Sequence, residues 1–132
     1  EMVRSIKDVY RDREFDLVTC VPMHKDTLRK RGYNQAELLA KECARLLGIE
    51  YADLLAKTKK NKTQHSIKAA ERAKNVIGVY SPIDKNLIKG KRILIIDDII
   101  TTGSTLGECA RILNKCKCGE ICCCTLCTSL LI

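Results

Sequence analysis

The sequence predicts an α/β fold in which helices flank a mainly parallel central sheet. Ile93, Leu94, Ile95 and Ile96 form an apolar run without polar alternation, which is typical of a parallel strand covered on both faces. Segments with strand and helix patterns also alternate along the chain, as they do in βαβ units. Because 132 residues is a common length for one folding unit, we expect a single domain over residues 1–132.

The first half of the chain is expected to contain two helices and a strand. Residues 3–12 carry only a weak helical pattern, whereas residues 15–21 are mostly apolar and end at Pro22, as a strand does. A basic loop follows this strand. Asn34 is suited to cap the N-terminus of a helix, and Gly48 is suited to end it. The next segment, residues 50–57, predicts a short strand or a strand-like turn.

The second half is expected to contain three strands and a helix. Residues 76–80 predict a strand that the following Ser-Pro pair breaks, and residues 91–97 predict the central strand. Apolar residues then recur at helical spacing over residues 104–117. Residues 121–127 predict the last strand.

Two local signals accompany these elements. Thr105 and Glu108 have the spacing of a capping box at the start of the predicted helix. Residues 66–74 have a pattern compatible with a short helix inside an otherwise polar and basic segment.

The charge is strongly positive and unevenly distributed. Basic residues outnumber acidic ones by 24 to 16, a formal charge of +8. The excess in residues 25–31 and 57–74 would suit a polyphosphate or a nucleic acid, and the alternative is a solvated surface rich in lysine. No run approaches the roughly 18 apolar residues of a membrane helix, so we expect no membrane partner.

Nine cysteines invite interpretation as a disulfide framework or a zinc site. The odd count and the lack of a visible signal peptide argue against a secreted disulfide scaffold. Cys116 with Cys118, and Cys124 with Cys127, resemble halves of a zinc site, but a strand would point neighbouring side chains to opposite faces. We therefore favour cysteines that pack as small apolar side chains in the reducing cytoplasm.

The most informative stretch comes at the end of the central strand, where Asp97 and Asp98 are followed by two apolar residues and then a small-residue loop. Two adjacent carboxylates are costly to bury, so we expect them in the crevice where open α/β sheets bind ligands. The loop consists of Thr101, Thr102, Gly103, Ser104 and Thr105. Hydroxyls and backbone N–H groups at a helix N-terminus bind anions. Acids beside a phosphate cradle indicate a ribose-phosphate ligand.

Other classes of protein also carry acids at strand ends. Nucleotide triphosphatases do, but they need a glycine-rich loop with a lysine that this sequence lacks. Phospho-acceptor receiver domains lack the Thr-Thr-Gly-Ser-Thr loop. A purely structural role for the two acids is the remaining alternative.

The loop after the first strand is expected to face the same crevice, since it also follows the carboxyl end of a strand. It contains His24, Lys25 and Arg31. The cations suit a pyrophosphate, which arginine binds in bidentate fashion. His24 belongs to a residue type that changes charge near neutral pH, and its alternative is an ordinary surface histidine.

Residues 93–105 resemble the binding motif of type I phosphoribosyltransferases, which bind phosphoribosyl pyrophosphate (PRPP). The resemblance implies the fold of that family. It implies that Asp97 and Asp98 contact the ribose hydroxyls, and that Mg²⁺ is a cofactor held by these acids directly or indirectly. It also implies that the loop from Thr101 to Thr105 surrounds the 5′-phosphate.

Further motifs are Pro-Met-His-Lys at 22–25, Arg-Gly-Tyr-Asn-Gln at 31–35 and Glu-Arg-Ala-Lys-Asn-Val-Ile-Gly at 71–78. With these motifs the chain resembles the ComF family, phosphoribosyltransferase-like proteins associated with competence and DNA uptake in bacteria. Many members carry an N-terminal four-cysteine zinc module, which these 132 residues do not contain.

The ComF resemblance also implies roles for residues outside the shared PRPP motif. Arg31, Asn34 and Gln35 would mark the pyrophosphate side of the site, next to His24. Three residues would belong to a segment that closes over the ligand: Gln64, Arg72 and Asn75.

The favoured function is a Mg²⁺-dependent transfer of the phosphoribosyl group to an unidentified acceptor. In this mechanism Lys25 and Arg31 stabilise the departing pyrophosphate, and residues 57–75 form a lid. Two alternatives without catalysis stay open: a competence protein that binds single-stranded DNA and competence partners, and a regulator that uses PRPP as a signal. The sequence leaves turnover undecided and predicts no oligomeric state.

Overall fold

A four-stranded parallel sheet forms the centre of the molecule, and the computed structural model describes residues 1–59, 77–100 and 103–128 of the chain. The strand order is β2-β1-β5-β6, and every neighbouring pair is parallel. The strands are β1 (Leu17–Cys20), β2 (Glu50–Tyr51), β5 (Arg92–Ile100) and β6 (Glu120–Thr128). The predicted α/β fold with a parallel central sheet is thereby confirmed.

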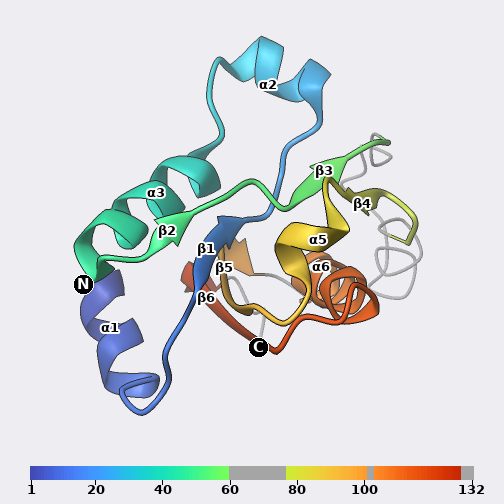
Figure 1. The fold of residues 1–132 in the computed structure, drawn as a ribbon. Coiled ribbons are helices and arrows are strands. Elements are labelled where there is room, and N and C mark those ends of the chain that lie inside the picture. The colour runs from blue at the N-terminus through green and yellow to red at the C-terminus, as the bar shows by residue number, and fades with distance from the viewer. Residues whose placement is uncertain (60–76, 101–102, 129–132) are drawn as a thin grey trace.

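Helices cover both faces of this sheet (Figure 1). On one face lie α1 (Met2–Val9) and α3 (Gln35–Leu47). The other face carries α5 (Lys85–Ile88), α6 (Ser104–Lys115) and a two-stranded antiparallel sheet of β3 (Leu55–Lys57) and β4 (Tyr80–Pro82). In the described part of the chain, no helix is long and apolar enough to cross a membrane.

Alternate residues of the central strands pack into two separate cores, one on each face of the sheet. This explains why the β5 sequence shows no polar alternation. Leu94 and Ile96 pack toward α3, whereas Ile93 and Ile95 pack toward α6. All four side chains are fully buried. Burial of each such side chain contributes about 1.5–3 kcal/mol, so β5 is held from both faces.

The chain leaves β1 and β5 in opposite directions and over opposite faces of the sheet, which creates a crevice between these two strands. The crossover to β2 runs through α3 on one face, and the crossover from β5 to β6 runs through α6 on the other. Ligands of open α/β sheets bind at such a switch point, outside the carboxyl ends of the strands.

One predicted loop is a helix. Residues 25–31 form α2 (Lys25–Arg31), where the sequence predicts only a basic loop. His24 supplies the N-cap, because its Nδ1 accepts a hydrogen bond from the Asp26 N–H at 3.1 Å. Gly32 ends the helix in the left-handed conformation, with φ of 86°. No residue of α2 is buried, and the helix stands away from the rest of the molecule (Figure 1).

The predicted strand over 76–80 is wrong in its position. Residues 77–79 form a turn, and β4 begins at Tyr80 and includes Pro82. The proline is tolerated because this strand belongs to a two-stranded sheet, in which one edge needs no donor. The segment over 50–57, predicted as a short strand or a strand-like turn, is divided between β2 and β3, which belong to different sheets.

The ends of the later elements also differ from the prediction. The expected capping box is absent: Gly103 is the N-cap of α6, and Glu108 accepts hydrogen bonds from Arg111 and from the Gly78 N–H instead. α5 has no counterpart among the predicted elements. β5 continues to Ile100 because β6 pairs with it along that length, so the two acids lie inside the strand.

The described cysteines act as packing residues. Eight of them are unpaired, and Cys43, Cys109 and Cys116 are buried on the inner faces of helices, as predicted. Burial raises the pKa of the Cys20 thiol to about 12, which makes it a weak nucleophile at neutral pH. Within residues 1–59, 77–100 and 103–128, no group of three or more metal-binding side chains gathers.

Gly119 is expected to be essential for stability. The turn before β6 packs against the turn before β5, and a Cβ atom at Gly119 would lie 2.9 Å from the backbone oxygen of Gly90. Because the nearest atoms all belong to the backbone, the clash could be relieved only by a shift of the backbone. Gly119→Ala should therefore lower the free energy of unfolding by about 1–3 kcal/mol in urea titrations.

Gly107→Ala is the matched control for this prediction. Gly107 lies inside α6 and faces open space, so alanine there should stabilise the protein by roughly 0.5–1 kcal/mol. Equal stability of the two variants would contradict the packing argument.

Candidate functional site

A cavity of about 240 Å³ lies at the carboxyl ends of β1 and β5. It brings together predicted site residues from three separate segments of the chain. Those that line it are His24, Arg31, Asn34, Gln35, Asp97, Asp98 and Thr105. The crevice expected from the strand order therefore contains both the acids and part of the basic loop.

The acids lie on β5 where it borders the cavity. Asp97 Oδ1 accepts a hydrogen bond from the Asp98 N–H at 2.9 Å, and Asp98 Oδ1 accepts one from the Ile99 N–H at 2.9 Å. Burial, together with the adjacent Asp98 carboxyl, raises the pKa of Asp97 above the ordinary aspartate value. The protein thus holds a carboxylate pair in a place where its negative charge is costly.

The donor set at these acids fits Mg²⁺. Magnesium prefers oxygen ligands and is usually held by one or two carboxylates, with water and substrate phosphates completing the shell. Asp97 and Asp98 supply such carboxylates side by side at the cavity wall. A divalent cation there would also offset the charge that burial makes unfavourable.

His24 and Asn34 position the loop at the mouth of the cavity. Asn34 caps α3 through its Oδ1, which accepts from the Ala36 N–H at 3.1 Å, and its Nδ2 donates to the Val21 oxygen at 3.2 Å. His24 caps α2. Both side chains are buried, so they fix the path of the chain from β1 into the two helices.

The two cations that the sequence assigns to pyrophosphate face different spaces. Arg31 and Thr27 of α2 line the cavity that contains the acids. Lys25 and Leu28 line a neighbouring cavity of about 550 Å³. The two cavities share a wall formed by Pro22, Met23, His24, Asn34 and Lys57.

Lys57 and Tyr80 also line the cavity, although neither is among the predicted site residues. The sequence places Lys57 only in the basic segment over 57–74 and in the expected lid over 57–75, whereas the structure places it in β3. The two residues lie opposite each other in the β3–β4 pair, and the Lys57 Nζ is 5.8 Å from the centre of the Tyr80 ring. Burial lowers the pKa of Lys57, while nearby Cys109 and Asp97 act in the opposite direction. Lys57 follows buried Leu55 by two positions, and this strand periodicity is the signal that would have separated it from the surface lysines.

Part of the predicted phosphate loop starts α6 beside the acids. Gly103 has a left-handed backbone with φ of 81°, and the helix begins at Ser104. Thr105 lines the cavity together with buried Tyr80, whose pKa is raised by burial. The predicted residues Thr101, Thr102, Gln64, Arg72 and Asn75 lie outside the described residues.

The family model named phosphoribosyl transferase domain matches residues 34–130. Competence protein F from Haemophilus influenzae is 33% identical over 121 residues, covering 90% of this chain and 53% of the relative. The DNA utilization protein YhgH from Escherichia coli K12 is 30% identical over 101 residues, covering 76% of this chain and 44% of the relative. The chain therefore spans about half the length of these curated relatives.

Solved structures show the same fold at lower sequence identity. Adenine phosphoribosyltransferase from Saccharomyces cerevisiae superposes with a TM-score of 0.61 at 16% identity, over 96% of this chain and 63% of that one. This likeness supports the fold alone and confirms the predicted type I phosphoribosyltransferase architecture. The chain belongs to the phosphoribosyl transferase domain family, and its similarity to competence protein F confirms the predicted ComF resemblance.

Proposed function

We propose that this domain binds PRPP, or a closely related ribose phosphate, and transfers the phosphoribosyl group to a nitrogenous acceptor. One observation carries the proposal. Two acids on β5 and two cations from other elements, Arg31 and Lys57, line one small cavity at the switch point of the sheet. This combination suits a ligand that carries both vicinal hydroxyls and phosphates.

In this proposal the carboxylates of Asp97 and Asp98 accept hydrogen bonds from the ribose hydroxyls and orient the sugar. Residues 101–105 take the 5′-phosphate at the start of α6, a helix of 12 residues whose first N–H groups and dipole favour an anion. Mg²⁺, when bound, would neutralise phosphate charge beside the two acids.

The cations would act on the group that leaves C1. As the C1–O bond breaks, negative charge develops on the pyrophosphate, and positive groups already in place lower the barrier. Arg31 and Lys57 line the cavity itself, and Lys25 extends the basic wall into the neighbouring cavity. Gln64, Arg72 and Asn75 would belong to a closing segment, which would exclude water during transfer.

A second candidate function is binding of single-stranded DNA. The exposed surface of α2 carries Lys25, Arg29, Lys30 and Arg31, and Tyr33 beside it is 51% exposed. Basic side chains with an exposed aromatic ring suit a phosphate backbone and a stacked base. The names of the relatives, competence and DNA utilization proteins, are consistent with this candidate and with competence partners.

Calorimetric titration with PRPP and Mg²⁺ tests the proposed function. Saturable binding is expected for the wild type, and no detectable binding for Asp97→Asn combined with Asp98→Asn. Lys57→Met should weaken binding about 10- to 100-fold, because one charged hydrogen bond contributes about 1.5–3 kcal/mol.

Lys85→Met is the control for Lys57→Met. Lys85 is exposed at the start of α5 and lines neither cavity, so its loss should leave PRPP affinity unchanged. Unaltered affinity in the double aspartate variant would refute the site.

Asp97→Asn is expected to stabilise the protein at pH 8. Because the pKa of Asp97 is raised in the folded state, the native protein holds a proton that the unfolded chain releases near pH 4. This group's contribution to stability therefore falls as the pH rises from about 4 to the raised native pKa. Urea unfolding should show that the free energy of unfolding of Asp97→Asn exceeds that of the wild type by an amount that grows from pH 4 to pH 8.

Asp12→Asn serves as the control for the pH series, since Asp12 is exposed in the turn after α1. It should show no comparable gain. If Asp97→Asn were less stable than the wild type at pH 8, the carboxylate would be a structural element and not a group held for a ligand.

DNA binding would be tested by fluorescence anisotropy with a labelled oligonucleotide. Replacement of Arg29 and Lys30 by alanine should weaken DNA binding. It should also make the slope of log K against log salt less steep by about 1.4, because each of the two lost phosphate contacts accounts for about 0.7 of the slope. PRPP affinity should not change, because these two residues line neither cavity. An unchanged salt slope would exclude α2 as the DNA contact.

A further inference from the structure

We propose that a separate cavity, at the end of the sheet opposite to the acids, binds an acidic peptide segment of a partner protein through an apolar side chain and its neighbouring carboxylates. This cavity has a volume of about 550 Å³ and lies between α1, residues 10–15, the end of α3 and the start of β5. We call it the amino-end cavity. The inference does not rest on the proposed function, because this cavity shares no lining residue with the two cavities at the acids.

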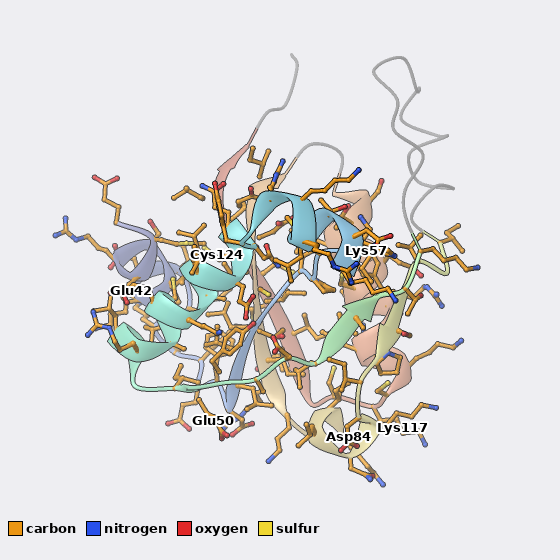
Figure 2. The ribbon with its side chains drawn as sticks, turned by 90° about the horizontal axis from the view of Figure 1, so that it is seen from above. Glu42, Glu50, Lys57, Asp84, Lys117 and Cys124 are labelled. Atoms are coloured by element: carbon orange, nitrogen blue, oxygen red, sulfur yellow. The ribbon has the colours of Figure 1, made fainter. Side chains whose placement is uncertain are left out.

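The amino-end cavity lies where the strands begin. Its wall includes Arg92, the first residue of β5, Phe15, two positions before β1, and Ile49, directly before β2. α1, which forms another wall, lies at the end of the molecule away from α2 (Figure 1). It also lies beside the part of α3 that carries Glu42, far from Lys57 (Figure 2). A molecule bound in this cavity would therefore not occupy the proposed phosphoribosyl site.

The inner wall of the amino-end cavity is apolar. Four of its side chains are partly buried and pack against the core between the sheet and α3: Tyr10, Phe15, Leu47 and Ile49. Each of them therefore has one side against the core and leaves the rest of its apolar surface in the cavity. An apolar side chain of a ligand would remove this surface from water, and the volume is within the range of ligand sites.

Two of the four cations that line the amino-end cavity are already paired. Arg92 donates from Nε and Nη2 to the Asp16 carboxylate at 3.1 and 3.0 Å, and from Nη1 to Glu14 Oε2 at 3.2 Å. Arg13 forms an ion pair with Glu120. These contacts also engage Glu14, the one acid in the lining. They fix the wall of the cavity and leave little charge on it for a ligand.

The other two cations have no such partner. Lys7 and Arg11 line the cavity and are exposed, and neither forms an ion pair with any residue in the described part of the chain. The nearby acids Asp8 and Asp12 are exposed and do not line the cavity. Two available positive charges thus stand beside an apolar recess, and a ligand that complements both must be an amphipathic anion.

An acidic peptide has this chemistry. Side chains one position apart in an extended peptide point to opposite sides, and those two positions apart point to the same side. An apolar side chain can therefore enter the recess while carboxylates next to it in the sequence reach the lysine and the arginine. Carboxylates form charge-assisted hydrogen bonds with both kinds of cation.

A membrane surface and a nucleic acid fit this cavity less well. A helix that lies on a membrane turns its apolar face to the lipid, whereas Ile6 of α1 is buried against the core. Bases stack on free aromatic faces, whereas the rings of Tyr10 and Phe15 pack edge to face, with centres 5.8 Å apart. The Tyr10 hydroxyl also donates to the Cys123 oxygen at 2.9 Å, which fixes the ring.

Fluorescence anisotropy with two labelled hexapeptides tests the apolar part of the proposal. The first peptide consists of four aspartates, a leucine and a phenylalanine, and saturable binding to the whole chain is expected at low ionic strength. In the second peptide, serines replace the leucine and the phenylalanine. It should bind at least about tenfold more weakly, because it keeps the charge and loses the apolar burial. Absence of binding, or equal affinity of the two peptides, would overturn the proposal.

Variants of the protein test the charged part. Lys7→Ala combined with Arg11→Ala should weaken binding of the first hexapeptide about 2- to 30-fold, the range expected for two exposed ion pairs. Arg4→Ala combined with Lys85→Ala is the matched control, because it removes the same charge from exposed residues that line none of the three cavities. Its affinity should equal that of the wild type. Equal loss in both double variants would indicate attraction to the net charge of +8 alone and would overturn the site.

Two further titrations separate the competing interpretations. If Lys7→Ala with Arg11→Ala lost affinity for phosphatidylglycerol vesicles or for oligothymidylate, but kept that for the hexapeptide, the assignment to a peptide would be wrong. The same variant should bind PRPP as the wild type does. Failure of the wild type to bind PRPP would refute the proposed function and leave the peptide site standing, whereas failure to bind the hexapeptide would overturn the peptide site alone.

Discussion

The placement of two adjacent carboxylates on a strand buried from both faces is the constraint on which the site depends. The part of β5 that precedes the acids has apolar neighbours on each side of the sheet. This packing fixes the position of the strand and thereby the position of the acids. Asp97 is then held where burial and Asp98 raise its pKa. This arrangement opposes stability, and a ligand rich in hydroxyls and phosphates, or a divalent cation, would relieve it.

Two polar residues near the acids have a structural role as helix caps, although their place beside the cavity suggests contact with a ligand. His24 and Asn34 each cap a helix, and both are buried between the two cavities. Their side chains thereby fix where α2 and α3 begin relative to the site. A change at either residue would alter the shape of both cavities, so loss of function there would report positioning as well as contact.

The β3–β4 pair completes the site from the opposite side. Its register places Lys57 against Tyr80, and both residues line the same cavity as Thr105 at the start of α6. The cation, the ring and the first turn of α6 therefore border one cavity. Leu55 of the same pair lines the neighbouring, larger cavity, so one short antiparallel sheet contributes to both cavities.

The sequence by itself determined the parallel sheet, the helix that Asn34 caps, the helix that begins at Ser104, and the acidic motif. Each of these depends on a periodicity or a contiguous run that local sequence carries. Only the tertiary structure decided that Lys57 and Tyr80 face the acids, since their pairing joins residues 23 positions apart. It also decided that 25–31 is helical, where a histidine cap outweighs a weak pattern, and that Lys25 and Arg31 face different cavities. Long-range packing decides which elements become neighbours, and a local pattern shows at most which face of its own element a residue occupies.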